Sequence, residues 1–213
     1  MSESVTPPAS PERARKNRLL LLILALSFVV PFIVGDLAYR FHWYEGAQVN
    51  KGRLIDPPVE FATLATRNAT GEALTAAFAG KHWWLLYVLP ADCEAACRNR
   101  LFQMRQVRKA LGKESDRLRQ AIVVTGALSP ATEALLQKEF PDFVRISGET
   151  ARIDAAFAAV TPAASAAGEL YIMDPMGWIM LSYAPEANEK VSVEKAEDVL
   201  TDLRKLLKAS RIG

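Results

Sequence analysis

The two cysteines of this chain, Cys93 and Cys97, lie just after an apolar run at 84–89. That run consists of aromatic, leucine and valine residues, a composition typical of a buried strand. From residue 92 to about 111, apolar residues recur at spacings of three and four, which indicates a helix with one inward face. The sequence therefore predicts a strand that ends in two thiols at the beginning of a helix.

Both cysteines belong to the predicted inward face of this helix. Residues four apart on a helix have Cα atoms about 6 Å apart, within the range that a disulfide tolerates. The helix N-terminus favours the thiolate of Cys93; Asp92 and Glu94 oppose this effect, whereas Arg98 and Arg100 support it. Three interpretations stay open: a redox-active dithiol, a Cu(I)-binding pair of thiolates, or a structural disulfide that staples the first helical turn.

An apolar segment at 19–35 follows a basic cluster of Arg13, Arg15, Lys16 and Arg18. As a helix this segment measures about 25 Å, close to the thickness of a bilayer core. The alternative is a cleaved signal peptide, but no small-x-small cleavage site follows the segment. Because basic residues flank the N-terminal side, we expect that end in the cytoplasm and the rest of the chain exported.

These features predict four regions. Residues 1–18 form a cytoplasmic basic tail, residues 19–39 a transmembrane anchor and residues 40–58 a linker, and residues 59–213 form an exported domain. Outside the cytoplasm a disulfide can form and persist.

Within the exported domain, predicted strands alternate with predicted helices. We expect strands at 59–64, 84–89, 121–125, 143–146, 170–173 and 178–183, and helices at 92–111, 129–140, 150–159 and 193–208. Strands separated by helices imply a parallel core. The last two strands flank a turn at 174–177 and add an antiparallel hairpin. The predicted fold class is α/β, with a mixed central sheet flanked by helices.

Composition and charge exclude several classes of function. The net charge of +2 gives no basis for binding nucleic acid, and two cysteines cannot form a four-cysteine zinc site. We find no Gly-rich phosphate loop and no Ser/His/Asp arrangement. The helix after the cysteines carries Arg98, Arg105 and Lys109 away from its apolar stripe; this is either a solvated face or a docking surface for an acidic partner.

Over residues 50–210 the chain resembles the Sco/SenC family. The resemblance rests on Gly80-Lys81 before the strand, on the Cys93-x-x-x-Cys97 pair, on the run 170–177 and on the single N-terminal anchor. It implies a thioredoxin-like fold preceded by one transmembrane helix in the bacterial inner membrane, with the domain in the periplasm. It also implies a role in cytochrome c oxidase assembly, either by delivering copper or by keeping the cysteines of the copper centre reduced.

The chain departs from this family at one position of the copper site. The family has a histidine shortly before the late strand, whereas residues 164–169 here contain none. The two histidines of the chain are His42 and His82, and Met173 or Met176 would be the remaining candidates to assist two thiolates. We therefore expect weak or no Cu(II) binding.

The sequence thus favours a periplasmic thiol-disulfide oxidoreductase that assists oxidase assembly, with Cys93 as the attacking thiol and Cys97 as the resolving thiol. One alternative is a Cu(I) chaperone that uses Cys93 and Cys97 as copper ligands. Another is a non-catalytic assembly or docking subunit. The expected partners are the inner membrane and an oxidase subunit or its assembly factors, with no nucleic acid.

Overall fold

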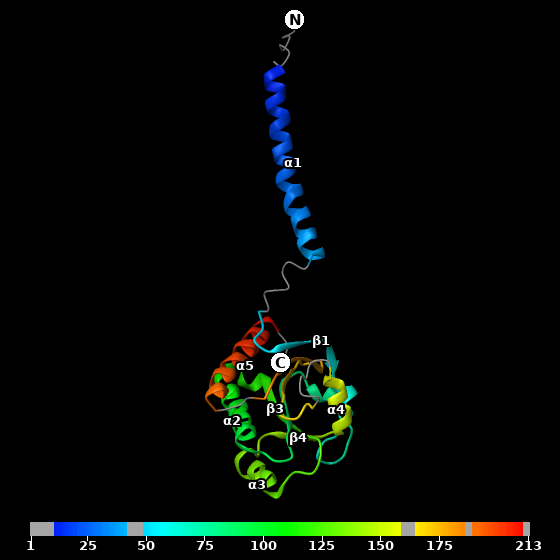
Figure 1. The fold of residues 1–213 in the computed structure, drawn as a ribbon, viewed down its shortest axis with the longest axis vertical. Helices are drawn as coiled ribbons and strands as arrows, with labels where there is room; N and C mark the ends of the chain where they lie inside the picture. Colours follow the sequence, from blue (N-terminus) through cyan, green and yellow to red (C-terminus); the bar gives the residue numbers. More distant parts are fainter. Residues whose placement is uncertain (1–10, 42–48, 159–164, 186–188, 211–213) are drawn as a thin grey trace, which may run out of the picture. The chain divides into compact units, whose positions relative to one another are not determined.

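The computed structural model describes residues 11–41, 49–158, 165–185 and 189–210. Contacts divide the chain into two units, Met1–Val49 and Asn50–Gly213. The described part of the first unit contains one helix, α1 (Pro11–Arg40), and the second unit contains a sheet covered by helices (Figure 1).

From Leu19 to Gly35, helix α1 is apolar on all sides. Within Arg15–Arg40, an 18-residue stretch reaches a mean hydropathy of 2.5, and none of that stretch is buried. At 1.5 Å per residue, the 30-residue helix measures about 45 Å, more than a bilayer core requires. The hydroxyl of Ser27 donates to the carbonyl of Leu24, so that this polar group is satisfied within the helix. An N-terminal helix that is able to span a membrane is therefore confirmed.

Six strands form one mixed sheet in the second unit. They are β1 (Arg53–Glu60), β2 (Trp83–Leu89), β3 (Leu118–Val124), β4 (Val144–Ser147), β5 (Leu170–Met173) and β6 (Trp178–Tyr183), in the order β1-β6-β5-β2-β3-β4. Strands β2, β3 and β4 are parallel, and β5 pairs antiparallel with β2. The predicted parallel core with an antiparallel hairpin is confirmed.

Helices cover both faces of the sheet. They are α2 (Ala95–Ala110), α3 (Pro130–Glu139), α4 (Thr150–Phe157) and α5 (Glu189–Ala209). Leu85 and Tyr87 of β2 belong to the core under α2, α3 and α5, whereas Leu86 and Val88 belong to the core under α4. Helices α2 and α5 lie side by side (Figure 1). Because both faces of β2 are covered, its sequence is continuously apolar rather than alternating.

The first strand differs from the prediction. A strand was expected at 59–64, but β1 covers Arg53–Glu60 and residues Phe61–Leu64 form a 3-10 turn. Pro57 and Pro58 are accommodated because β1 is an edge strand, where a missing N–H breaks no ladder. The register with β6 shifts between Leu54 and Val59, at the two prolines.

The helix after the cysteines also begins later than predicted. It starts at Ala95 rather than near residue 92, because Glu94 has an extended backbone (φ −74°, ψ −171°) and forms the N-cap. Cys97 therefore lies in the first turn of α2, whereas Cys93 precedes the helix. The inward stripe is confirmed, since Leu101, Met104 and Val107 are buried.

The predicted hairpin turn between β5 and β6 is confirmed. The Asp174 carboxylate accepts hydrogen bonds from the N–H groups of Met176 (2.9 Å) and Trp178 (2.8 Å). Gly177 has a φ of +92°, a conformation that side chains disfavour. The turn lies at the end of the sheet opposite the cysteines, because β5 runs antiparallel to β2.

Candidate redox site

Cys93 and Cys97 form a disulfide just beyond the carboxyl end of β2. Their Cα atoms are 5.1 Å apart, and their exposed fractions are only 7% and 4%. The structure thus brings together the two residues that the sequence predicted as the site. A disulfide across four residues closes a small loop and restricts the unfolded chain little. Its position at a helix N-terminus is more typical of a reactive disulfide than of a stabilising one.

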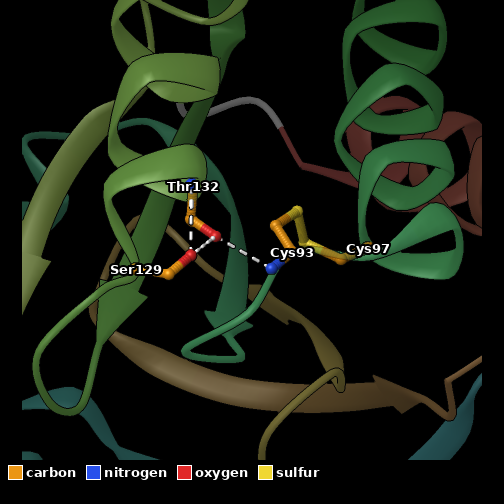
Figure 2. Close-up of a disulfide and its surroundings, with 4 residues drawn as sticks. All are labelled: Cys93, Cys97, Ser129 and Thr132. Atoms are coloured by element: carbon orange, nitrogen blue, oxygen red, sulfur yellow. Dashed lines mark hydrogen bonds between the residues drawn. A yellow bond between two sulfur atoms is a disulfide. The ribbon is translucent and has the colours of Figure 1, made fainter.

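Helix α3 holds the disulfide from one side (Figure 2). The backbone N–H of Cys93 donates a 2.9 Å hydrogen bond to the hydroxyl of Thr132, which is itself buried. The Thr132 and Ser129 hydroxyls are 2.9 Å apart, and the Ser129 oxygen caps α3 by accepting from the Thr132 N–H. The predicted cap of α3 is confirmed, and its role in positioning Cys93 was not predicted.

A hollow of about 250 Å³ opens on the other side of the disulfide. Cys97 contributes to its lining, together with the buried Arg100, the acidic residues Asp92 and Glu94, and Gly168 from the opposite wall. Residue 168 is a glycine with a φ of +87°, and a Cβ there would come within 3.1 Å of Pro185. The positive φ and the closeness of Pro185 explain the glycine at this position.

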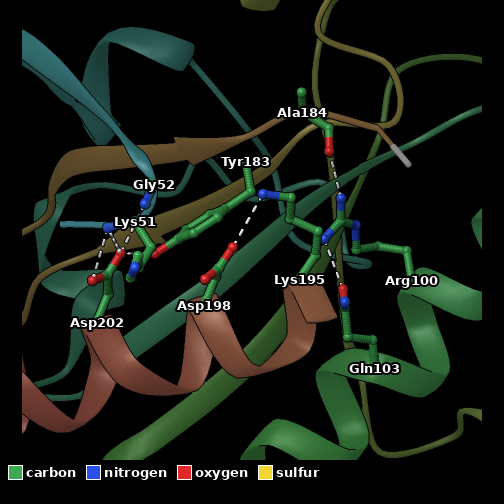
Figure 3. Close-up of polar contacts among 9 residues, drawn as sticks. All are labelled: Lys51, Gly52, Arg100, Gln103, Tyr183, Ala184, Lys195, Asp198 and Asp202. Atoms are coloured by element: carbon green, nitrogen blue, oxygen red, sulfur yellow. Dashed lines mark hydrogen bonds and ion pairs between the residues drawn. The ribbon is translucent and has the colours of Figure 1, made fainter. Parts of the chain in front are cut away.

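The buried Arg100 lines this hollow, and Figure 3 shows the contacts of its guanidinium. It donates to the Gln103 side-chain carbonyl (2.7 Å) and to the Ala184 carbonyl (2.6 Å). Only 2% of Arg100 is exposed. From the sequence, Arg100 was expected among the charges that support a thiolate, and the burial of its side chain was not predicted. Its spacing of three from Cys97, at the border of the apolar stripe, was the available signal.

Glu169 is a second buried charge at the same end of the sheet. Its carbonyl accepts from the Val88 N–H, one residue before β2 ends. Burial raises the pKa of the Glu169 carboxyl above its ordinary value of 4.5, and the positive charges of Arg53 and Arg100 offset part of this effect. In the sequence this segment is notable only for its lack of a histidine, and the buried carboxyl was not predicted.

A buried network next to the site ties the beginning of the domain to α5 (Figure 3). The Asp202 carboxylate accepts from the N–H groups of Lys51 (2.8 Å) and Gly52 (2.8 Å) and from the Tyr183 hydroxyl (2.8 Å). Burial and the adjacent Asp202 raise the pKa of Tyr183, so this hydroxyl stays protonated as a donor. A Cβ on Gly52 would lie 2.6 Å from the Tyr183 ring, which explains the glycine.

The candidate third copper ligands lie far from the disulfide. Met173 pairs with Trp84, and His82 precedes β2, so both lie about one strand length, roughly 20 Å, from the cysteines. Met176 lies in the distant hairpin turn, and His42 falls outside the described residues. These three described candidates are thus wrong as ligands. Among the described residues no group of three His, Cys, Asp or Glu side chains is placed to hold a metal.

Comparison with known proteins gives the same fold. Residues 83–210 match the family model described as transmembrane-like, thioredoxin-like, C-terminal domain. The structure of BsSco, a member of the Sco family of cytochrome c oxidase assembly proteins, is similar with a TM-score of 0.52 and 14% identity, covering 77% of this chain and all of that chain.

The solution structure of apo Sco1 from Thermus thermophilus is similar with a TM-score of 0.51 and 17% identity, covering 75% of this chain and 99% of that chain. No curated protein sequence matches this chain. The predicted thioredoxin-like fold is confirmed.

Proposed function

The chain belongs to the family of transmembrane-like, thioredoxin-like C-terminal domains, and on that basis we propose that it is a membrane-anchored thiol-disulfide exchange protein. One observation carries the proposal: the Cys93–Cys97 disulfide lies at the first turn of α2, with Cys97 bordering an open hollow. The same cysteines were the predicted catalytic residues.

The proposed exchange proceeds through a mixed disulfide. In the reduced protein, the Cys93 thiolate attacks one sulfur of a partner's disulfide, and the partner's other sulfur leaves as a thiolate. The Cys97 thiolate then attacks Cys93, which releases the partner as a dithiol and forms the Cys93–Cys97 bond. Two electrons pass to the partner, and the two protons from the thiols of the protein end on the two sulfurs of the partner. The reverse sequence oxidises the partner.

Two features support Cys93 as the attacking thiol. Cys93 immediately precedes the N-cap of α2 and is bonded to Cys97 in the first turn of that helix, and a helix N-terminus favours an anion. Its backbone is held by Thr132, which keeps the residue in place when the disulfide opens.

The proposed partner is a cytochrome c oxidase subunit or one of its assembly factors. BsSco is described both as a member of a family of oxidase assembly proteins and as the carrier of a disulfide switch. For this chain we propose the bacterial inner membrane, with residues 1–18 cytoplasmic, 19–39 spanning and the domain from Asn50 onward in the periplasm. The apolar helix and the basic residues before it support that topology.

Trapping the mixed disulfide tests the exchange. In the full chain expressed in its native membrane, Cys97→Ser removes the resolving thiol, so a covalent partner should accumulate and disappear on reduction. Cys93→Ser is the matched control, and we expect it to trap much less. If neither variant captures a partner, and a double serine variant still supports oxidase assembly, the chain is a docking subunit and exchange is wrong.

A Cu(I) chaperone is the second candidate, because reduction of the disulfide leaves two sulfurs on residues 5.1 Å apart at Cα. Two thiolates suffice for Cu(I), which is soft. The reduction potential of the Cys93–Cys97 couple, measured with and without one equivalent of Cu(I), separates the two candidates. A potential that copper leaves unchanged supports exchange, and a large shift supports copper transfer as the primary role.

A further inference from the structure

A second hollow, of about 440 Å³, lies on the side of α2 that the proposed function does not use. Arg105, Arg108 and Lys109 of α2 border it, together with Gln120 near the beginning of β3. Glu139 at the end of α3 and Asp142 in the segment between α3 and β4 line another part of the wall. Because β3 runs parallel to β2, this hollow is near the amino ends of the strands, away from the disulfide.

Two residues that border the hollow each carry a buried hydrogen-bond donor without a partner among the described residues. Gln120 is only 7% exposed, and its side-chain nitrogen, Nε2, finds no acceptor in this part of the chain. The same holds for the buried Nε atom of Arg105. A buried donor that has neither water nor a protein acceptor lowers the stability of the fold. Two such donors on residues that border one hollow point to a ligand that supplies the acceptors.

The guanidinium of Arg105 is fixed in place rather than loose. Its Nη1 donates to the Glu139 carbonyl (3.1 Å), and its planar group lies 5.2 Å and 5.1 Å from the ring centres of Phe102 and Phe140. Arg108 is fixed as well, since its Nε donates to the carbonyls of Ser115 and Leu118. The hollow therefore has two preorganised arginines, which reduces the entropy lost on binding a ligand.

The charges favour an anion. Three cationic side chains face two carboxylates, those of Glu139 and Asp142, and both of these residues are exposed at the rim. A single water occupies about 30 Å³ and would leave most of the hollow unfilled. An oxyanion has several acceptor oxygens and no competing donors, so one group can satisfy both orphaned donors.

We propose that this hollow binds an oxyanion group, a carboxylate or a phosphate, through Gln120 Nε2 and Arg105 Nε. The site is independent of the disulfide. The basic side chains of α2 would then bind a defined oxyanion group, rather than only attract acidic surfaces in general. The exposed Lys109 adds positive charge at the rim, so it raises the affinity for the anion without fixing the position of the anion.

Thermal unfolding of the full chain in a non-ionic detergent tests this site. Sodium phosphate and sodium succinate are titrated separately against sodium chloride of equal ionic strength. We expect a saturable rise in Tm with at least one of the two, of about 3 °C at ten times Kd. The salt that gives the rise identifies the group as phosphate or carboxylate.

Three variants make the result specific. Gln120→Leu removes an orphaned donor at similar volume, so it should abolish the rise while keeping or increasing Tm without ligand. Lys109→Gln, at an exposed position, should weaken apparent affinity several-fold. Arg98→Gln lies on the same helix outside the hollow and should keep the rise. No rise with either anion, or an equal rise in Gln120→Leu and Arg98→Gln, would overturn the proposal, because phosphate also stabilises proteins non-specifically.

Discussion

The backbone N–H of Cys93 donates its hydrogen bond to the hydroxyl of Thr132, a residue 39 positions later on α3. This contact joins the disulfide to a helix that follows the next strand of the sheet. The cysteine that precedes α2 is therefore positioned by α3 as well as by its disulfide to α2. A single hydroxyl forms the contact with α3, so substitutions of Thr132 are informative.

Thr132→Val keeps the shape of the side chain and removes that hydroxyl. The buried N–H of Cys93 then has no acceptor, and we expect the free energy of unfolding to fall by about 1–3 kcal/mol. Thr132→Ser is the matched control, because it retains the hydroxyl. Denaturation by urea of the oxidised full chain measures both. An equal loss in the two variants would show that the methyl group matters and the hydrogen bond does not.

Asp202→Asn should destabilise the domain more than Asp198→Asn, although both are aspartates of α5 only four residues apart. Asp202 accepts from three donors and is 2% exposed, so we expect a loss of about 2–3 kcal/mol. Asp198 forms one largely exposed ion pair with Lys195, worth about 0–1 kcal/mol. Chemical denaturation at neutral pH compares them. Equal losses would refute the importance of the Asp202 network.

Glu169→Gln should stabilise the domain at neutral pH. Burial raises the folded-state pKa of Glu169, so the folded state binds this proton more tightly than the unfolded state does. Stability therefore falls as the pH rises from about 4.5 through the raised pKa. A tenfold difference in proton affinity corresponds to about 1.4 kcal/mol.

Unfolding measured from pH 4 to 8 tests this expectation. The gain in Glu169→Gln should be present at pH 7 and should shrink toward pH 4, where the wild-type carboxyl is protonated. Glu197→Gln, at an exposed position of α5, serves as control and should show no such trend. A variant that is less stable at pH 7 would mean that the charges of Arg53 and Arg100 outweigh burial.

His82→Ala should leave Cu(I) binding by the reduced protein unchanged, whereas Cys93→Ser or Cys97→Ser should weaken it strongly. His82 lies at the opposite end of β2, about 20 Å from the thiols, too far for a shared ion. Competition with a Cu(I) chelator provides the affinities. We further expect that Cu(II) gives no stoichiometric complex with thiolate absorption; a loss of affinity in His82→Ala would contradict this assignment of ligands.

The sequence predicted those parts of the fold that are encoded locally. The apolar run of β2, the inward stripe of α2, the Ser129 cap and the turn at Asp174 each depend on residues a few positions apart. Their patterns follow directly from the periods of helix and strand. The cysteine pair was predicted in the same way, from its place after a strand.

The features that the prediction missed depend on residues far apart in the chain. The buried Arg100 donates to a carbonyl 84 residues later, and the N–H of Cys93 donates to Thr132, 39 residues later. Pro57 and Pro58 were assigned to a linker because prolines disrupt interior strands, but the topology makes β1 an edge. No local pattern contains such contacts, so only the assembled sheet reveals them.

The network around Asp202 also constrains the order in which the domain can be built during synthesis. Gly52, at the beginning of the domain, bonds to a carboxylate 150 residues later. While the chain emerges from the ribosome, β1 has therefore no partner in α5 until nearly the whole domain has been made. During most of translation the start of the domain therefore lacks this contact. It forms only when α5, which is synthesised last, packs against the residues that were synthesised first.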